Sequence, residues 1–176
     1  MHSIQFAQSL IRTCAFTYRQ AANRLTVNEF REDQLYGISL AWTLLHLTGQ
    51  LEWAVKQTNA QGSIHDVAIL EQVKGATSDT SARTVVALVP DNGEIMRMFE
   101  ESVERALSVL DSANPRWLEL PNDVSALTAF PSVAAVWKHV AFHMSWHLGQ
   151  LATVYPQLVG PLYSEPPLYD YTGNLD

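Results

Sequence analysis

Three histidines in apolar segments are the residues of this chain best suited to chemistry. His143 and His147 form an H-x3-H pair in the segment HVAFHMSWHLGQLATV, and His46 lies in the apolar stretch SLAWTLLHLTGQLEWAV. On an α-helix, residues four positions apart lie one above the other, with their Cβ atoms about 5–6 Å apart. One helix could therefore hold an ion through His143 and His147, and a facing helix could add His46. Three neutral imidazoles with one open coordination position are typical of a catalytic metal site.

Four segments carry the apolar spacing of three and four that predicts amphipathic helices. They cover about residues 3–25, 35–57, 91–114 and 131–158. The polar connection between the first two is short, which makes those helices antiparallel neighbours. The connection over 62–90 is long enough for a crossover, with one short helix expected in IHDVAILEQVKG and extended chain in TSARTVVALVP. The prediction is an all-α four-helix bundle forming a single domain over 1–176, with an irregular tail over 160–176.

Composition narrows the class of protein. The chain is 47% hydrophobic and 16% charged, which favours a packed globule over disorder. Its formal net charge is −7 and it has no run of Lys or Arg, so no nucleic acid is expected as a partner. Neither a signal peptide nor an apolar run of about 18 residues is present, so no membrane partner and a cytoplasmic location are expected. The single cysteine excludes an intrachain disulfide and Cys-based metal sites.

Two motifs and the long gap between the second and third helices resemble one family. The motifs are HMSWHLGQLATV, where H-x3-H is followed by one residue and Gly-Gln, and LLHLTGQLEWAV, with a single histidine mid-helix. They are similar to the DinB-like (DNA-damage-inducible) four-helix metalloproteins and the related YfiT-like thiol transferases. The resemblance implies an up-down-down-up bundle, a homodimer, and one divalent metal held by His46, His143 and His147. Trp146 and Leu148 depart from the family, since many members have His and Arg there.

Three further polar side chains share the histidine faces. His139 forms a competing H-x3-H pair with His143, but it lies about 12 Å of helix rise from His147, so one ion cannot bind all three. The Gly-Gln that follows His147 in the family favours the later pair and leaves His139 as a neighbouring group. Gln150 and Gln50 could orient a ligand or a bound water, or could make ordinary buried hydrogen bonds.

Aromatic side chains accompany the histidines. Trp42, Trp53 and Trp146 could form an apolar wall near the ion, although aromatics at helical spacing are more often plain core. Gly149, in mid-helix, indicates either close approach of another helix or chain beside the metal or a tolerated small residue. Cys14 is interpreted as a core thiol, so no nucleophile from the protein itself is expected.

The predicted function is that of a metal-dependent enzyme. The ion would be zinc, nickel, iron or manganese, and it would activate a thiol or water for attack on a small-molecule substrate. Transfer from a low-molecular-weight thiol is favoured slightly over hydrolysis. The alternative from another class is a non-catalytic metal-binding stress-response module, which a fourth protein ligand such as Asp66 or Glu165 would favour.

Overall fold

The computed structural model describes residues 2–32, 39–59, 63–75, 79–113, 130 and 132–154. Every secondary-structure element in this part of the chain is an α-helix, so the predicted all-α class is confirmed. The helices are α1 (His2–Ala22), α2 (Val27–Arg31), α3 (Leu40–Asn59), α4 (Val67–Gly75), α5 (Asp79–Ala87), α6 (Asn92–Ser112) and α8 (Val133–Val154). The predicted irregular tail over 160–176 lies outside the described residues.

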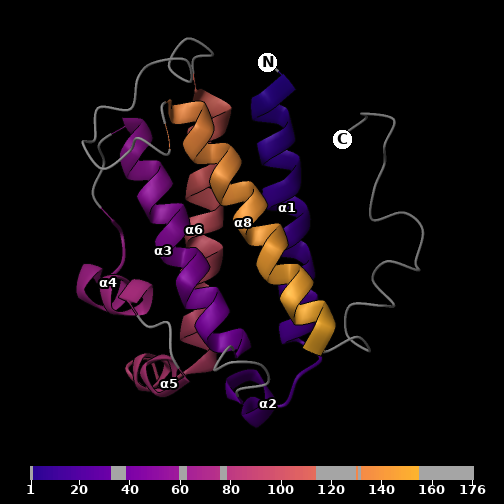
Figure 1. The fold of residues 1–176 in the computed structure, drawn as a ribbon, viewed down its shortest axis with the longest axis vertical. Coiled ribbons are helices and arrows are strands. Elements are labelled where there is room, and N and C mark those ends of the chain that lie inside the picture. The colour runs from indigo at the N-terminus through magenta and orange to yellow at the C-terminus, as the bar shows by residue number, and fades with distance from the viewer. Residues whose placement is uncertain are drawn as a thin grey trace.

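The long helices α1, α3, α6 and α8 lie side by side (Figure 1). α3 contacts α6 and α8, and α1 contacts the same two helices. The chain direction follows from the colours of Figure 1: α1 and α8 run one way, and α3 and α6 run the other. The antiparallel pairing of α1 with α6 brings Gln8 within 2.6 Å of Asp111 and Arg19 within 2.6 Å of Glu100.

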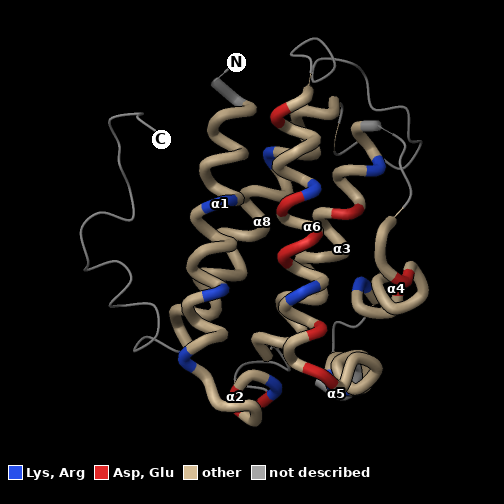
Figure 2. The backbone as a smooth tube through the Cα atoms, turned by 180° about the vertical axis from the view of Figure 1, so that it is seen from behind, with Lys and Arg blue, Asp and Glu red and all other residues tan. Residues whose placement is uncertain are grey.

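Helix α6 is buried along one side because its apolar residues recur three and four positions apart. Asp91 caps it, because its side chain accepts a hydrogen bond from the Gly93 backbone amide. The buried residues on this side of α6 include Ile95, Phe99, Ser102, Ala106 and Leu110. Acidic and basic residues also occur along α6, marked red and blue on the backbone tube in Figure 2. The alternation of buried and charged residues therefore orients α6 toward α3 and α1.

Two short helices were not expected from the sequence. α2 lies where a polar connection was predicted, and Thr26 and Glu29 form a capping box at its start. The prediction of extended chain over residues 80–90 is wrong, because α5 covers most of that run. The helix places Val85 and Val86 in the core, and Val89, just after its end, is also buried. This burial outweighs the local preference of valine for strands.

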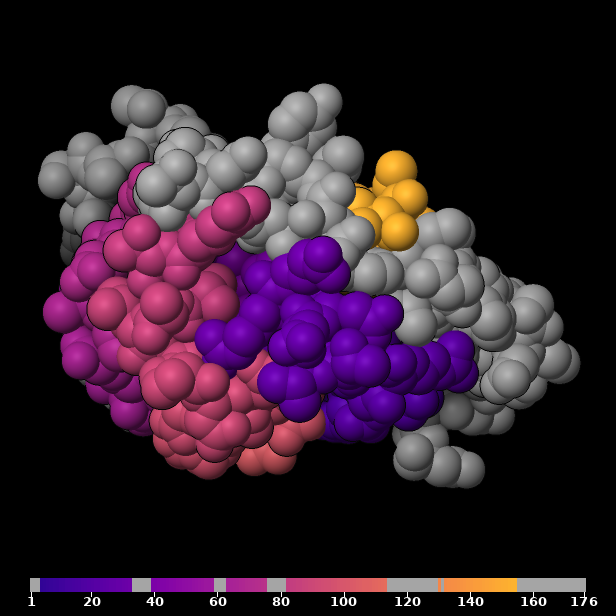
Figure 3. Space-filling view, turned by 90° about the horizontal axis from the view of Figure 1, so that it is seen from below, coloured from indigo at the N-terminus to yellow at the C-terminus, as the bar shows by residue number. Residues whose placement is uncertain are grey.

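α2 and α5 lie side by side at one end of the molecule, as the view from below shows (Figure 3). Arg31 joins them, because its guanidinium donates to the backbone carbonyls of Val86 and Val89 at 3.1 and 2.7 Å. Arg31 thus binds the carbonyl of Val86 in the last turn of α5 and that of Val89 just beyond the helix, where the regular intrahelical hydrogen bonds end. The connection between α3 and α6 thus contains α4, which matches the predicted short helix, and α5.

None of the helices that the structure describes combines the length and the apolar character required to cross a membrane.

Candidate metal centre

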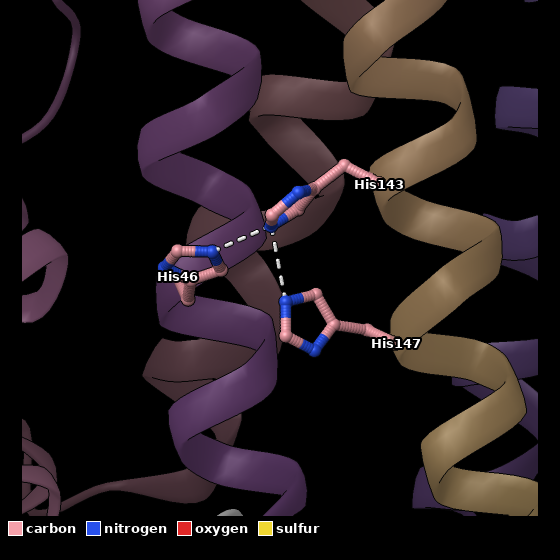
Figure 4. Close-up of side chains that lie close together, drawn as sticks. All are labelled: His46, His143 and His147. Atoms are coloured by element: carbon pink, nitrogen blue, oxygen red, sulfur yellow. Dashed lines mark hydrogen bonds between the residues drawn. The ribbon is translucent and has the colours of Figure 1, made fainter. Parts of the chain in front are cut away.

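The histidines of the candidate site come from α3 and α8. His143 and His147 lie one turn apart on α8, and His46 projects toward them from α3 (Figure 4). The Nε2 atom of His143 is 2.8 Å from Nε2 of His46 and 3.1 Å from Nε2 of His147. One ring nitrogen from each histidine lies within 4.8 Å of the other two. The structure therefore brings together the three histidines that the sequence singled out.

Contacts made by α3 and α8 fix the positions of the three histidines relative to one another. α3 starts after Ser39, whose hydroxyl accepts a hydrogen bond from the Trp42 backbone amide at 3.1 Å. The Trp137 indole of α8 donates to the Thr58 hydroxyl of α3 at 2.8 Å. From α1, the buried Tyr18 hydroxyl donates to the carbonyl of Met144, between the two histidines of α8, at 2.8 Å. α8 is thus fixed from two sides next to its H-x3-H pair.

The three histidine rings cannot form hydrogen bonds across both of their short nitrogen–nitrogen contacts at once. His147 donates from Nδ1 to the Gln150 side-chain oxygen at 2.7 Å, so its Nε2 carries a lone pair in the neutral ring. A neutral imidazole nitrogen has either one proton or one lone pair, so Nε2 of His143 can complete only one of its two short contacts as a hydrogen bond. A bound cation would accept all three lone pairs at once.

The histidines are held in the neutral form that binds metals. Burial, followed by repulsion from the charged forms of His147 and His143, lowers the pKa of His46 to about 3. Burial, and then repulsion from His147 and His139, lowers the pKa of His143 to about 4. Burial also lowers the pKa of His147, against the opposing effect of the Gln150 hydrogen bond. Metal coordination needs neutral imidazole, so the donor set fits a divalent transition metal.

Two of the three tryptophans considered as an apolar wall, Trp42 and Trp146, flank the histidine rings. Trp42 stacks on His46, with ring centroids 4.7 Å apart and an interplanar angle of 8°, and presents its ring to His147 at 5.7 Å. Trp146 lies 4.8 Å from the His147 ring, and 59% of its surface is exposed. These aromatic surfaces exclude water from one side of the histidines and leave an edge of the site near the surface.

The three polar side chains predicted to lie near the metal ligands make different contacts. Gln150 contacts His147 directly and fixes its tautomer, as outer partners of metal ligands commonly do. Gln50 lines a cavity together with His46. His139 lies outside the three-histidine group, with its ring 5.2 Å from that of His143, and it faces Trp53 and the same cavity.

Asp66, one of the two residues considered for closing the coordination shell, lies elsewhere. Asp66 accepts a hydrogen bond from the Ala68 backbone amide at 2.8 Å at the start of α4 and does not belong to the group of possible ligands found among the described residues. Glu165 lies outside the described residues. At Gly149, an added Cβ would meet no atom within 4 Å, so the close approach considered for this position is not observed in the described part of the chain.

A buried ion pair between α3 and α6 was not predicted from the sequence. Glu52 of α3 is 4% exposed, and its carboxylate accepts from Arg105 at 2.6 Å, from Ser102 at 3.0 Å and from the Ile64 backbone amide at 3.2 Å. His65 contacts the Ser102 hydroxyl at 3.0 Å. The available signal was a lone carboxylate among the apolar residues of LTGQLEWAV, since a buried charge needs a partner. This network joins α3 to α6 and fixes the chain entering α4.

Comparison with family models, curated proteins and solved structures gives no match for this chain. Its resemblance to the DinB-like proteins therefore stays a prediction.

Proposed function

We propose that this protein binds one divalent transition metal through His46, His143 and His147 and uses it to activate a thiol or a water. The observation that carries the proposal is the convergence of three neutral ring nitrogens on one point, with more lone pairs than their own protons can satisfy. Zinc–imidazole bonds are about 2.0–2.1 Å long, so nitrogens around one ion are about 3.3 Å apart in a tetrahedral site. The Nε2 separations of 2.8 and 3.1 Å need only a small expansion to reach that value.

The proposed architecture is the up-down-down-up four-helix bundle of the DinB-like proteins. Its support is the mutual contact of the four long helices and their directions along the chain. In such a bundle, α3 and α8 are antiparallel neighbours, and a cofactor site on their facing surfaces lies in the bundle interior. The predicted homodimer stays a prediction.

An external thiol is the nucleophile that the proposal favours. A divalent ion with an open position lowers the pKa of a bound thiol or water, which produces a nucleophile near neutral pH. The chain's own thiol, Cys14, is buried, and burial raises its pKa to about 12. Cys14 is therefore a poor nucleophile, and a low-molecular-weight thiol would supply the sulfur for transfer to a small electrophile.

The chain's own residues have defined tasks in this proposal. Gln150 holds the tautomer of His147 that directs its Nε2 lone pair inward. Trp42 packs on the ring of His46 and holds its orientation. The aromatic rings exclude water from part of the site, which strengthens electrostatic interactions there.

The first test is metal content, measured by elemental mass spectrometry on untagged protein after incubation with zinc. About one equivalent is expected for the wild type, and a large loss for His147→Ala. His139→Ala is the matched control. Like His147, His139 lies four residues from His143, but it does not belong to the three-histidine group. Equal zinc in wild type and His147→Ala would refute the ligand assignment.

The second test addresses catalysis. Zinc-loaded wild type is mixed with L-cysteine or glutathione and a chromogenic aryl halide, and the conjugation rate is compared with that of His147→Ala. A metal-dependent rate supports thiol transfer. A zinc-loaded protein that is no faster than the variant, for any thiol tried, would contradict the enzyme proposal and favour a non-catalytic metal-binding role.

A further inference from the structure

A cavity of about 290 Å³ lies between α3 and α4, next to the histidines. The wall from α3 is one helical face, with His46, Gly49 and Trp53 spaced three and four residues apart. Small-molecule sites usually have volumes of about 300–1,000 Å³, so this cavity accepts a compact ligand. Because His46 belongs both to this wall and to the three-histidine group, a ligand in the cavity would lie beside the proposed metal.

The middle of the cavity is apolar. Trp53, Leu70 and Phe130 line it from three parts of the chain, and the rings of Trp53 and Phe130 pack edge to face with centroids 5.5 Å apart. Gly49 lacks a side chain where α3 faces Leu70, and a Cβ added there would lie 3.9 Å from the Cβ of Leu70. The middle of the cavity therefore fits an apolar part of a ligand that consists of a few carbon or sulfur atoms.

The outer part of the cavity carries one charge of each sign. Lys74 and Glu71, both on α4, line it, and their charged atoms are 4.0 Å apart. Their side chains are 64% and 67% exposed, and such a solvent-exposed pair contributes little stability to the helix. The two side chains are therefore free to turn toward a ligand that offers the complementary charges.

We infer that the cavity between α3 and α4 binds a compact zwitterion, an amino acid or a small amino-acid thiol. Its carboxylate would meet Lys74, its ammonium would meet Glu71, and its apolar or sulfur-bearing end would lie toward His46. The inference rests on the proposed function for what happens at that inner end. It defines the thiol substrate as one with an amino-acid head group.

L-methionine is the first probe, because it has the head group and a thioether that does not react as a thiol does. Binding is followed by chemical-shift changes of ¹⁵N-labelled protein, with and without zinc. Saturable binding with a dissociation constant of about 1 mM or lower is expected in both forms, since most of the wall does not depend on metal. N-acetyl-L-methionine, an anion, and L-methionine amide, a cation, should each bind at least fivefold more weakly.

Three variants locate the binding. Lys74→Glu should weaken L-methionine binding about tenfold and strengthen binding of the amide, because the outer part of the cavity then carries two acids. Gly49→Ala should weaken L-methionine binding about threefold by narrowing the cavity. Gly149→Ala is its control, because it makes the same change in a helix where the added Cβ meets no atom within 4 Å. Both alanines favour the helix, so neither variant should unfold the protein.

Several outcomes would overturn the inference. One is the absence of saturable L-methionine binding up to about 10 mM, and another is equal or tighter binding of the N-acetyl form, which would mean that an anion alone is recognised. Binding that Lys74→Glu leaves unchanged would place the ligand elsewhere. Failure of zinc binding with L-methionine binding intact would refute the proposed metal function alone, whereas zinc binding without L-methionine binding would refute this inference alone.

Discussion

Lowering the pH from 7 to 6 should scarcely weaken metal binding by this protein. Protons and metal ions compete for the same imidazole lone pairs. Three imidazoles with the ordinary pKa of about 6.5 would lose about thirtyfold in apparent affinity over that interval. Burial and mutual repulsion hold the pKa of His46 at about 3 and that of His143 at about 4, so both rings are neutral throughout.

Among the three histidines, only His147 can still bind a proton in competition with the metal between pH 7 and pH 6. Its pKa is lowered by burial, and even at the ordinary value a single imidazole would account for about a threefold loss. The expected loss of zinc affinity between pH 7 and pH 6 is therefore threefold or less. Titration calorimetry at pH 6, in two buffers of different ionisation enthalpy, should report fewer than one proton released from the imidazoles per zinc, against about two for ordinary histidines.

The measurement has a control and a clear failure. Circular dichroism of the metal-free protein at both pH values shows whether the fold itself is unchanged. At pH 6, a zinc-bound water with a pKa near 7 keeps most of its proton and adds little to the count. A thirtyfold loss of affinity with the fold intact would mean that the histidines are solvated in solution, and the reasoning from burial would be refuted.

Three further predictions concern the same protein without ligand. Arg105→Met should lower the free energy of unfolding in urea by about 3 kcal/mol, because it leaves the buried Glu52 carboxylate without its cation. Arg97→Met, which removes exposed pairs with Glu94 and Glu101, should change the free energy of unfolding far less, and equal losses in the two variants would contradict this prediction. Cys14 should react with a chromogenic disulfide reagent at pH 8 only as the protein unfolds, and rapid native labelling would contradict its burial. The metal-free protein should lose stability as the pH falls from about 6.5 toward 3, because the pKa of His46 is lower folded than unfolded and the unfolded chain binds the extra proton; a stability curve that is flat over that range would oppose this.

The local features of the fold could be predicted from the sequence. The Asp91 cap and the buried stripe of α6 follow from residues within one helix, where spacing and side-chain chemistry act over one or two turns. The pairing of His143 with His147 is of the same kind, because residues four apart on a helix are neighbours whatever the helix packs against. Helical class and two of the three candidate ligands were thus determined by local physics.

The tertiary structure decided which groups meet across helices. That His46 comes within 2.8 Å of His143, and that His139 instead faces Trp53, depends on how α3 and α8 are rotated and registered against each other. Packing also made α5 a helix in a valine-rich run, since burying one face outweighed a weak local preference. Glu52 is the strongest case: a carboxylate in an apolar stretch has no local meaning until α6 brings Arg105 to it.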